Sequence, residues 1–127
     1  MPAPVPLPTY IYKIVPHDPR PLTNGLPVSE LDRKDGFVHM STAEQTPNTV
    51  GRFFKDAEVV YLLKVPYTRV QTKIQWEEAG SGTFPHIYDG DLSKAIDDTV
   101  VDAVLECRRA ESGGWDGIVE KVISESA

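Results

Sequence analysis

The feature that most constrains the fold of this 127-residue chain is the uninterrupted apolar run Val59-Val60-Tyr61-Leu62-Leu63. A run without alternating polar residues is typical of a strand that is buried on both faces, so we predict a central strand over residues 57–65. Residues 10–15 are rich in aromatic and β-branched side chains and are followed by a proline, which predicts a second strand. Shorter or weaker strand patterns cover residues 37–40 and 68–76.

Residues 100–109 fit two kinds of structure. Val101, Val104 and Leu105 have helical spacing, whereas Val101, Ala103, Leu105 and Cys107 alternate as they would in a strand. We favour the strand. Residues 17–27 and 80–90 contain several prolines and glycines, which favour turns, so we predict loops there.

Three short helices are expected between these strands. The first begins at Val28 or Ser29 and ends at Gly36, which suits a carboxyl cap. The second has Thr46 as its amino cap and a proline at its first position. The third begins at Trp115, after a glycine-rich break. Short strands and helices without regular β-α-β spacing predict an α+β domain.

The chain is expected to be one domain over residues 10–127, preceded by a flexible proline-rich arm at residues 1–9. That arm has neither the basic segment nor the apolar segment of a signal peptide. No apolar run reaches the roughly 20 residues that cross a bilayer, so we expect a soluble protein without a membrane partner. Cys107 is the only cysteine and cannot form an internal disulfide. This favours a reducing compartment and a cytoplasmic location.

Acidic residues outnumber basic ones by 19 to 13, and the formal net charge is −6. A surface of this sign repels a phosphate backbone, so nucleic acid is not an expected partner. We also expect no metal, because the histidines form no short local pair and there is no cysteine framework. Nothing in the sequence sets the oligomeric state.

Two of the three histidines lie beside aromatic and polar neighbours. His39 is followed by Ser41 and Thr42, and His86 precedes Tyr88. His39 faces a cleft if its neighbours Val38 and Met40 face the core, and is a buried structural histidine if they do not. For Ser41 and Thr42, hydrogen bonding to the backbone of the following turn is favoured over a nucleophilic role.

Glu77 follows Trp76, and a glutamate buried beside an indole would have a raised pKa suited to proton transfer. His86 could orient a ligand, transfer a proton or bond to the backbone. The pattern as a whole is typical of a pocket for a small molecule.

The chain resembles the domain-of-unknown-function family numbered 952 (DUF952). The resemblance covers about residues 10–88 and rests on six stretches: Tyr10–Ile14, Ser29–Asp32, Asp35–Gln45, Arg52-Phe53-Phe54, Trp76-Glu77 and Phe84-Pro85-His86-Ile87-Tyr88. It implies an ADP-ribosyltransferase-like fold, in which a split antiparallel sheet is flanked by helices and a cleft holds NAD in catalytic members. Residues 37–41 are also similar to the His-x-His-Leu-Ser motif of tRNA 2′-phosphotransferases, with Phe37 in place of the first histidine. The chain lacks the His-Gly-Thr motif and the basic groove of that enzyme, so its RNA substrate does not carry over.

We therefore expect a cofactor-independent enzyme that acts on a small metabolite by general acid/base catalysis, of the isomerase, lyase or cyclase type. His39 is the expected acid/base, with Glu77 as its partner carboxylate and His86 as a third catalytic residue that orients the substrate. Five further residues are expected to contact the substrate: Tyr12, Ser41, Thr42, Trp76 and Tyr88. One alternative is an NAD-using ADP-ribosyl or phosphoryl transferase, and another is a ligand-binding module without turnover.

Overall fold

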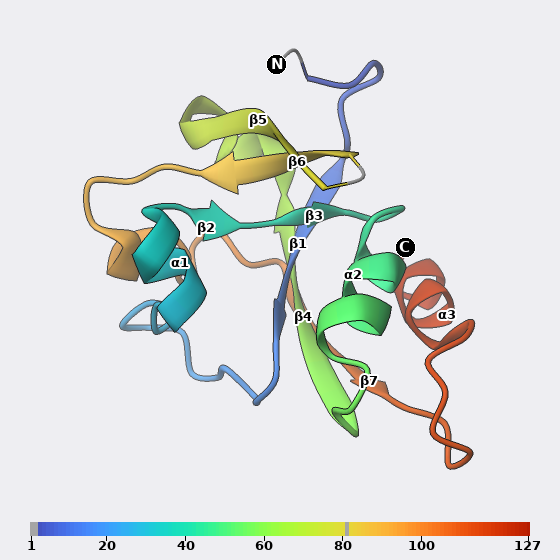
Figure 1. Ribbon diagram of the computed structural model, residues 1–127. Helices are drawn as coiled ribbons and strands as arrows, with labels where there is room; N and C mark the ends of the chain where they lie inside the picture. Colours follow the sequence, from blue (N-terminus) through green and yellow to red (C-terminus); the bar gives the residue numbers. More distant parts are fainter. Residues whose placement is uncertain (1–2, 81) are drawn as a thin grey trace.

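The computed structural model describes residues 3–80 and 82–127, and these residues form two antiparallel sheets (Figure 1). The four-stranded sheet has the order β3-β1-β4-β7, and the three-stranded sheet has the order β2-β6-β5. The strands of the first sheet are β1 (Tyr10–Val15), β3 (Ser41–Thr42), β4 (Val59–Pro66) and β7 (Ala103–Arg108). Those of the second are β2 (Val38–His39), β5 (Ile74–Ala79) and β6 (Gly82–Ile87).

The chain passes directly from one sheet to the other between β2 and β3, which are separated only by Met40. Figure 1 shows the two short strands following one another across the middle of the molecule. The predictions of an α+β domain and of a split antiparallel sheet flanked by helices are confirmed.

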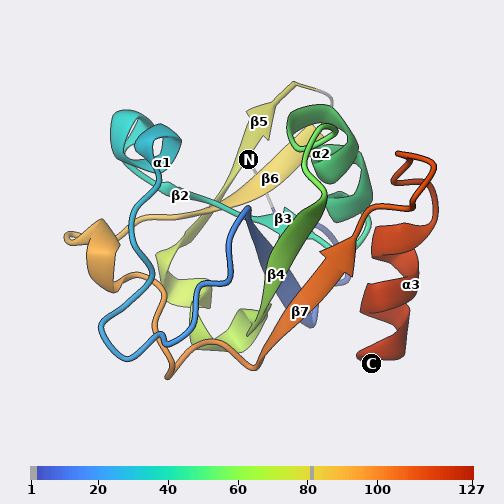
Figure 2. The same ribbon diagram turned by 90° about the horizontal axis from the view of Figure 1, so that it is seen from below.

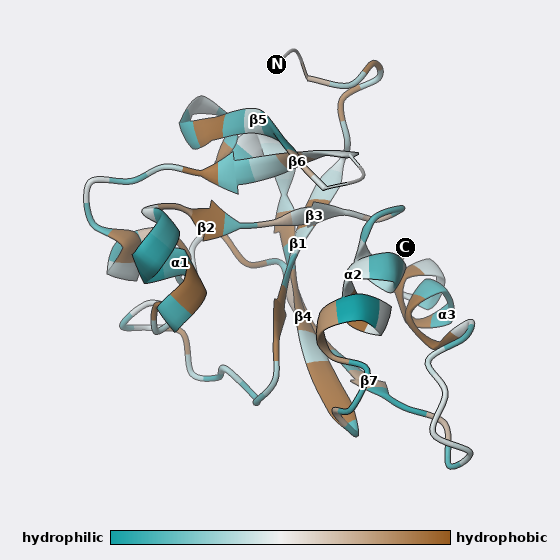
Figure 3. Cartoon of the chain, in the orientation of Figure 1, coloured by the Kyte–Doolittle hydropathy of each residue, from teal (hydrophilic) through white to brown (hydrophobic). Residues whose placement is uncertain are grey.

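The central position of the apolar run is also confirmed. β4 pairs with β1 along one edge and with β7 along the other, and Val60, Leu62 and Leu63 are fully buried. β7 confirms the preference for a strand over a helix within residues 100–109. In Figure 3 the hydrophobic colour follows β4, as expected for a strand with protein on both faces.

The prediction of a loop over residues 80–90 is wrong for most of that range. β5 and β6 form a hairpin in which Ala79 pairs with Gly82, so residues 82–87 of the predicted loop belong to a strand. β6 also pairs with β2, so tertiary pairing outweighs the turn-forming residues that flank the strand. Most of the strand predicted over residues 68–76 is instead two single-turn 3₁₀ helices, Tyr67–Arg69 and Gln71–Lys73, and β5 begins only at Ile74.

Helix α1 (Glu30–Asp35) has the predicted ends. The Ser29 hydroxyl oxygen accepts a hydrogen bond from the amide of Asp32, and Gly36 adopts the left-handed conformation with φ of 81°. Helix α3 (Ile118–Glu125) begins three residues later than predicted, because Trp115 belongs to the turn that precedes it.

Helix α2 (Thr46–Phe53) is capped differently from the prediction. The Thr46 hydroxyl donates a hydrogen bond back to the Thr42 carbonyl and caps no amide. Instead, the Thr42 hydroxyl accepts from the Gln45 amide at 3.3 Å, and the Gln45 side-chain oxygen accepts from the Thr42 amide at 3.0 Å. This reciprocal pair is a capping box built on the turn just before the helix.

Two clusters of buried side chains hold the layers together. Helices α2 and α3 cover one face of the four-stranded sheet, and Val50, Leu62 and Val119 are among the residues packed between them (Figure 2). The opposite face packs against the three-stranded sheet, where Met40 and Ile87 belong to the core. Helix α1 lies beside β2, at the edge of the second sheet. Within the described residues, the helices are too short or too polar to cross a membrane.

Candidate functional site

Two histidines lie side by side on the outer face of the three-stranded sheet. The register of β2 and β6 pairs His39 with His86, and their ring centroids are 5.2 Å apart. Because side chains alternate along a strand, Val38, Met40 and Ile87 point to the core while the two imidazoles point away from it. The Phe37 ring stacks on His86 at 4.1 Å and lies 4.6 Å from His39.

His86 is held by Glu77 on the neighbouring strand β5. Its Nδ1 lies 2.7 Å from Glu77 Oε1, and the Tyr88 hydroxyl donates to the same oxygen at 2.6 Å. The hydrogen bonds from Tyr88 and then His86 lower the pKa of Glu77, and the bond to Glu77 raises the pKa of Tyr88 to about 12. The expected rise in the pKa of Glu77 is therefore wrong. Trp76 points into the core on the opposite face of β5, so its indole does not desolvate the carboxylate.

The His86 side chain is only 5% exposed, and Phe37 covers one face of its ring, so the second ring nitrogen is the part that a small molecule could reach. Nε2 makes no hydrogen bond with another described residue. Solvent still reaches this atom, because every fully buried side-chain nitrogen or oxygen of the described residues has a hydrogen-bond partner. A proton on Nδ1, donated to Glu77, leaves the Nε2 lone pair free. This arrangement of carboxylate and imidazole prepares the ring to accept a proton.

His39 has a different environment. Its Nδ1 lies 2.6 Å from Asp32 Oδ1, and its Nε2 lies 3.0 Å from Asp35 Oδ2. Both carboxylates belong to helix α1, and they lie about one helical turn apart beside the His39 ring. The contact with Asp32 is a hydrogen bond and the contact with Asp35 is at ion-pair distance, so Asp32 orients the ring and Asp35 lies where it can stabilise a proton on Nε2.

A buried ion pair holds Asp32 in place. Lys13 Nζ donates to Asp32 Oδ2 at 2.7 Å and to the His39 carbonyl at 3.1 Å. Burial alone would raise the pKa of Asp32, but the hydrogen bond from His39 and the charge of Lys13 bring it below its usual value. Burial lowers the pKa of Lys13, against the opposing effect of Asp32. The pair thus fixes α1, β1 and β2 around the imidazole.

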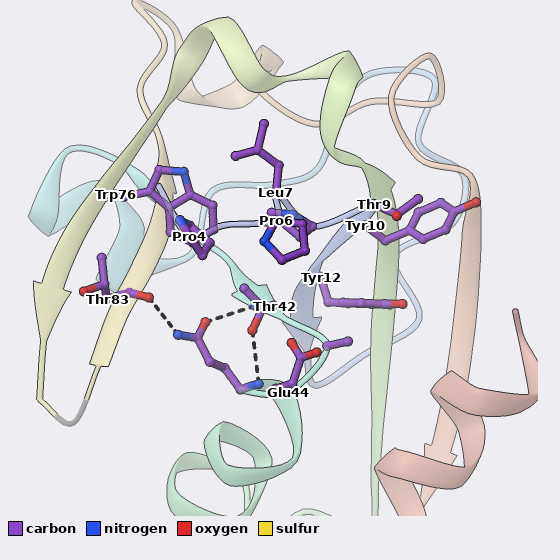
Figure 4. Close-up of a pocket in the computed structure, with 13 residues that line it drawn as sticks. Pro4, Pro6, Leu7, Thr9, Tyr10, Tyr12, Thr42, Glu44, Trp76 and Thr83 are labelled. Carbon is purple, nitrogen blue, oxygen red and sulfur yellow. Dashed lines mark hydrogen bonds between the residues drawn. The ribbon is translucent and has the colours of Figure 1, made fainter. Parts of the chain in front are cut away.

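A groove of about 780 Å³ lies on the other side of the three-stranded sheet (Figure 4). Residues 4 and 6–10 and Tyr12 line one part of it, residues 42–45 line another, and Trp76 and Thr83 supply the wall from β5 and β6. The next residue in the sequence after each of them, Glu77 and Phe84, lies on the opposite face of the sheet, where the two pair with each other. The sheet therefore separates the groove from the histidines.

The predicted site residues divide between these two places. His39, Glu77, His86 and Tyr88 come together on the outer face, whereas Tyr12, Thr42 and Trp76 line the groove. Ser41 is buried on β3 opposite Tyr12 and belongs to neither group.

The capping box closes one side of the groove. Besides its two bonds to Thr42, Gln45 donates from Nε2 to the Thr83 carbonyl at 2.7 Å, and Figure 4 draws these three bonds as dashed lines. The side chain of Gln45 therefore ties the start of α2 to β6, across the split between the sheets.

Four residues of these sites were not expected to act there: Lys13, Asp32, Asp35 and Gln45. The spacing Thr-x-x-Gln is a capping-box signature and could have identified Gln45. A lysine inside an apolar strand could have identified Lys13. Asp32 and Asp35 gave no local signal, because their role depends on how α1 folds back onto β2. No three His, Cys, Asp or Glu side chains in the described ranges are placed to hold a metal ion.

Residues 22–104 match the sequence model of a family described as "Protein of unknown function (DUF952)". The crystal structure of protein CC0527 from Caulobacter crescentus is similar to this chain with 25% sequence identity and a TM-score of 0.65, and the match covers 84% of this chain and 92% of that one. The solution NMR structure of CC0527 is similar with 27% identity and a TM-score of 0.60, over 83% and 90% of the two chains. No curated protein matches the chain.

Proposed function

We propose that this chain, which belongs to the DUF952 family of proteins of unknown function, catalyses proton transfer on a small organic molecule at the outer face of β2 and β6. The observation that carries the proposal is the pairing of two imidazoles with different hydrogen-bond environments, 5.2 Å apart. His86 has a ring nitrogen without a hydrogen-bond partner among the described residues, and His39 has two carboxylates within 3.0 Å of its ring nitrogens. Reactions that remove one proton and return another need such a pair.

His86 is the general base in this proposal. Its Nε2 takes a proton from a substrate carbon, and the Glu77 carboxylate stabilises the resulting imidazolium through Nδ1. Because the pKa of Glu77 is lowered, Glu77 stays ionised at neutral pH and orients the ring rather than exchanging a proton itself. The sequence suggested His39 as the acid/base and His86 as a residue that orients the substrate, whereas this proposal gives the base step to His86 and keeps the acid step for His39.

His39 is the general acid. Asp32 holds its Nδ1 from a buried position, whereas Asp35 and the outer part of the ring are partly exposed. A substrate atom can therefore replace the partly exposed Asp35 carboxylate beside Nε2 and receive its proton, while the buried contact of Nδ1 with Asp32 stays in place. The Phe37 ring covers His86 and excludes water from one side of the base. Isomerases, lyases and cyclases all use this combination of steps, and the chemistry needs no cofactor.

The geometry favours this reaction over an NAD-using transferase. In the transferase reading, His39 anchors a ribose and Glu77 polarises it, so both should face the groove. Neither residue is part of its lining. The ADP-ribosyltransferase-like grouping and the cytoplasmic location stay predictions.

Proton exchange in D₂O tests the proposal without knowledge of the product. Small carbonyl compounds that raise the melting temperature are incubated with the protein, and proton NMR follows the loss of a carbon-bound hydrogen signal. We expect His86→Gln to slow the exchange by roughly a hundredfold or more, and His39→Gln to slow any net conversion. His17→Gln is the matched control, because that exposed histidine lies outside the cluster. Exchange at the full rate in His86→Gln would refute the assignment.

The histidine tautomer provides a second test that needs no substrate. Nitrogen-15 NMR of the folded protein should find the neutral His86 ring protonated on Nδ1, and Glu77→Gln should weaken that preference. A ring protonated on Nε2 in the wild-type protein would contradict the proposed base.

A further inference from the structure

The acid–base groups of the outer face form one row across the strands. Glu77 lies on β5, His86 lies on the neighbouring strand β6, and His39 follows on β2. Asp35 ends the row on helix α1, which lies beside β2. Because neighbouring strands lie about 4.8 Å apart, a carboxylate lies at each end of the row and the two imidazoles lie between them.

The charges of this row restrict what can bind to it. The side chains of the two end carboxylates are open to solvent, at 37% exposed for Glu77 and 35% for Asp35. The donors beside Glu77 are already bonded to its Oε1, and the buried Lys13 ammonium is held in its own ion pair. Among the described groups of the row, His39 Nε2 is the donor that is left for a substrate. A carboxylate or phosphate on the substrate would therefore meet two negative charges.

The proton donor and Asp35 are coupled. Asp35 Oδ2 lies 3.0 Å from His39 Nε2, so a carbonyl oxygen that receives the proton must take the place of this carboxylate. The displaced carboxylate loses its partner, because Asp35 makes no other ion pair or side-chain hydrogen bond with a described residue. A cationic group just beyond the carbonyl of the substrate gives Asp35 a new partner, and an anionic group there repels it.

We infer that the substrate of the proton transfer is an amino ketone, in which the carbonyl lies between an acidic C–H group and a protonated amine. This inference rests on the proposed function and names its substrate class. His86 Nε2 takes the proton, and the electron pair of the C–H bond forms the C=C bond of an enol. The π electrons of the carbonyl bind the proton of His39 Nε2 at oxygen, and the ammonium group pairs with Asp35. The order of the three substrate groups thus matches the order of the three residues across the row.

Three methyl ketones test the inference: aminoacetone, hydroxyacetone and pyruvate. They share the methyl group and the carbonyl, and the group on the other side of the carbonyl is cationic, neutral or anionic. Each ketone is incubated with the protein in D₂O at neutral pH, and proton NMR follows the loss of the methyl signal. Each rate is divided by the rate with free imidazole, which corrects for the acidity of the ketone. We expect the relative rate for aminoacetone to exceed that for hydroxyacetone about fivefold, and pyruvate to be slowest.

One variant and a matched control locate the source of this preference. In Asp35→Asn the ratio of the aminoacetone rate to the hydroxyacetone rate should fall to about one or two. Glu30→Gln removes a charge from an exposed position of the same helix and should keep the ratio of the wild type. Amide NMR shifts of Phe37 and Tyr88 in the same titrations give the order of the three affinities without any need for turnover.

The two measurements separate this inference from the proposed function. Hydrogen loss no faster than with free imidazole for every ketone, while aminoacetone still binds most tightly, would refute the proton transfer and support the ligand class. Exchange that is as fast or faster with hydroxyacetone or pyruvate would overturn the substrate class and leave the proton transfer standing. A preference for aminoacetone that survives in Asp35→Asn, or the absence of saturable aminoacetone binding, would also overturn the substrate class.

Discussion

Substitution of Lys13 and of Asp32 should destabilise the protein unequally, although the two residues form one ion pair. Both side chains are more than nine-tenths buried. Asp32→Asn keeps the size of the side chain but leaves a buried ammonium with only neutral acceptors. Removal of one partner of a buried pair costs about 3–5 kcal/mol. Lys13→Met should cost less, about 1–2 kcal/mol, because Asp32 keeps the amide and Nδ1 of His39 as donors.

Urea unfolding followed by fluorescence measures these costs. Trp76 and Trp115 are buried in different core clusters, so a single transition reports both parts of the fold. With a urea dependence of about 1–3 kcal/mol per molar, Asp32→Asn should lower the midpoint by about 1–5 M. The double variant Lys13→Met/Asp32→Asn should be more stable than Asp32→Asn alone, because it buries no unpaired charge. An Asp32→Asn midpoint close to the wild-type value, or a double variant less stable than Asp32→Asn, would refute this reasoning.

The contribution of the Lys13–Asp32 ion pair to the free energy of unfolding should depend on pH. The pKa of Asp32 is lowered in the folded protein, so its carboxylate adds stability above the ordinary pKa of 3.8. That contribution is lost as the pH falls through the lower value of the folded state. The gap in unfolding free energy between wild type and Asp32→Asn should therefore narrow at acidic pH, while the exposed control Asp116→Asn should show little gap at any pH. A gap that stays constant down to acid unfolding would contradict this sign.

Three further predictions concern single positions. Gln45→Ala removes one capping bond and the contact across the split, and should cost about 1–2 kcal/mol in urea unfolding; an unchanged midpoint would show that neither bond matters. Gly25→Ala would place a Cβ 2.2 Å from the Ser93 carbonyl at a φ of 85°, so it should lower the melting temperature more than Gly113→Ala, which has a φ of 92° but open space. Burial raises the pKa of Cys107 to about 11, so its thiol should react with a disulfide reagent only as the protein unfolds; fast labelling of the folded protein would contradict this.

The sequence predicted the parts of the fold that depend on local pattern. The central strand followed from an apolar run, and the ends of α1 followed from Ser29 and Gly36. The hairpin strand β6 was not predicted, because its flanking glycines resemble a loop and only pairing with β5 and β2 makes it a strand. Glycines and prolines in the sequence thus predicted the positions of turns, but they did not predict whether the residues between two turns form a strand.

The candidate site was only partly predictable for a similar reason. His39, Glu77 and His86 stood out because of their neighbours in the sequence, and the structure brings them together. Which face each side chain occupies depended on strand register, which no short motif encodes. For that reason Trp76 was paired with Glu77 as a neighbour, although the two lie on opposite faces of β5.

The direct passage from β2 through Met40 to β3 restricts how the length of this chain can vary. Val38 and Met40 point to the core, while His39 between them points outward. One inserted or deleted residue would reverse this alternation and shift the pairing of β2 with β6 or of β3 with β1. The loop at residues 111–114, which is exposed throughout, has no such constraint. Insertions and deletions should therefore be tolerated in that loop and be rejected between residues 38 and 42, whatever residues occupy those positions.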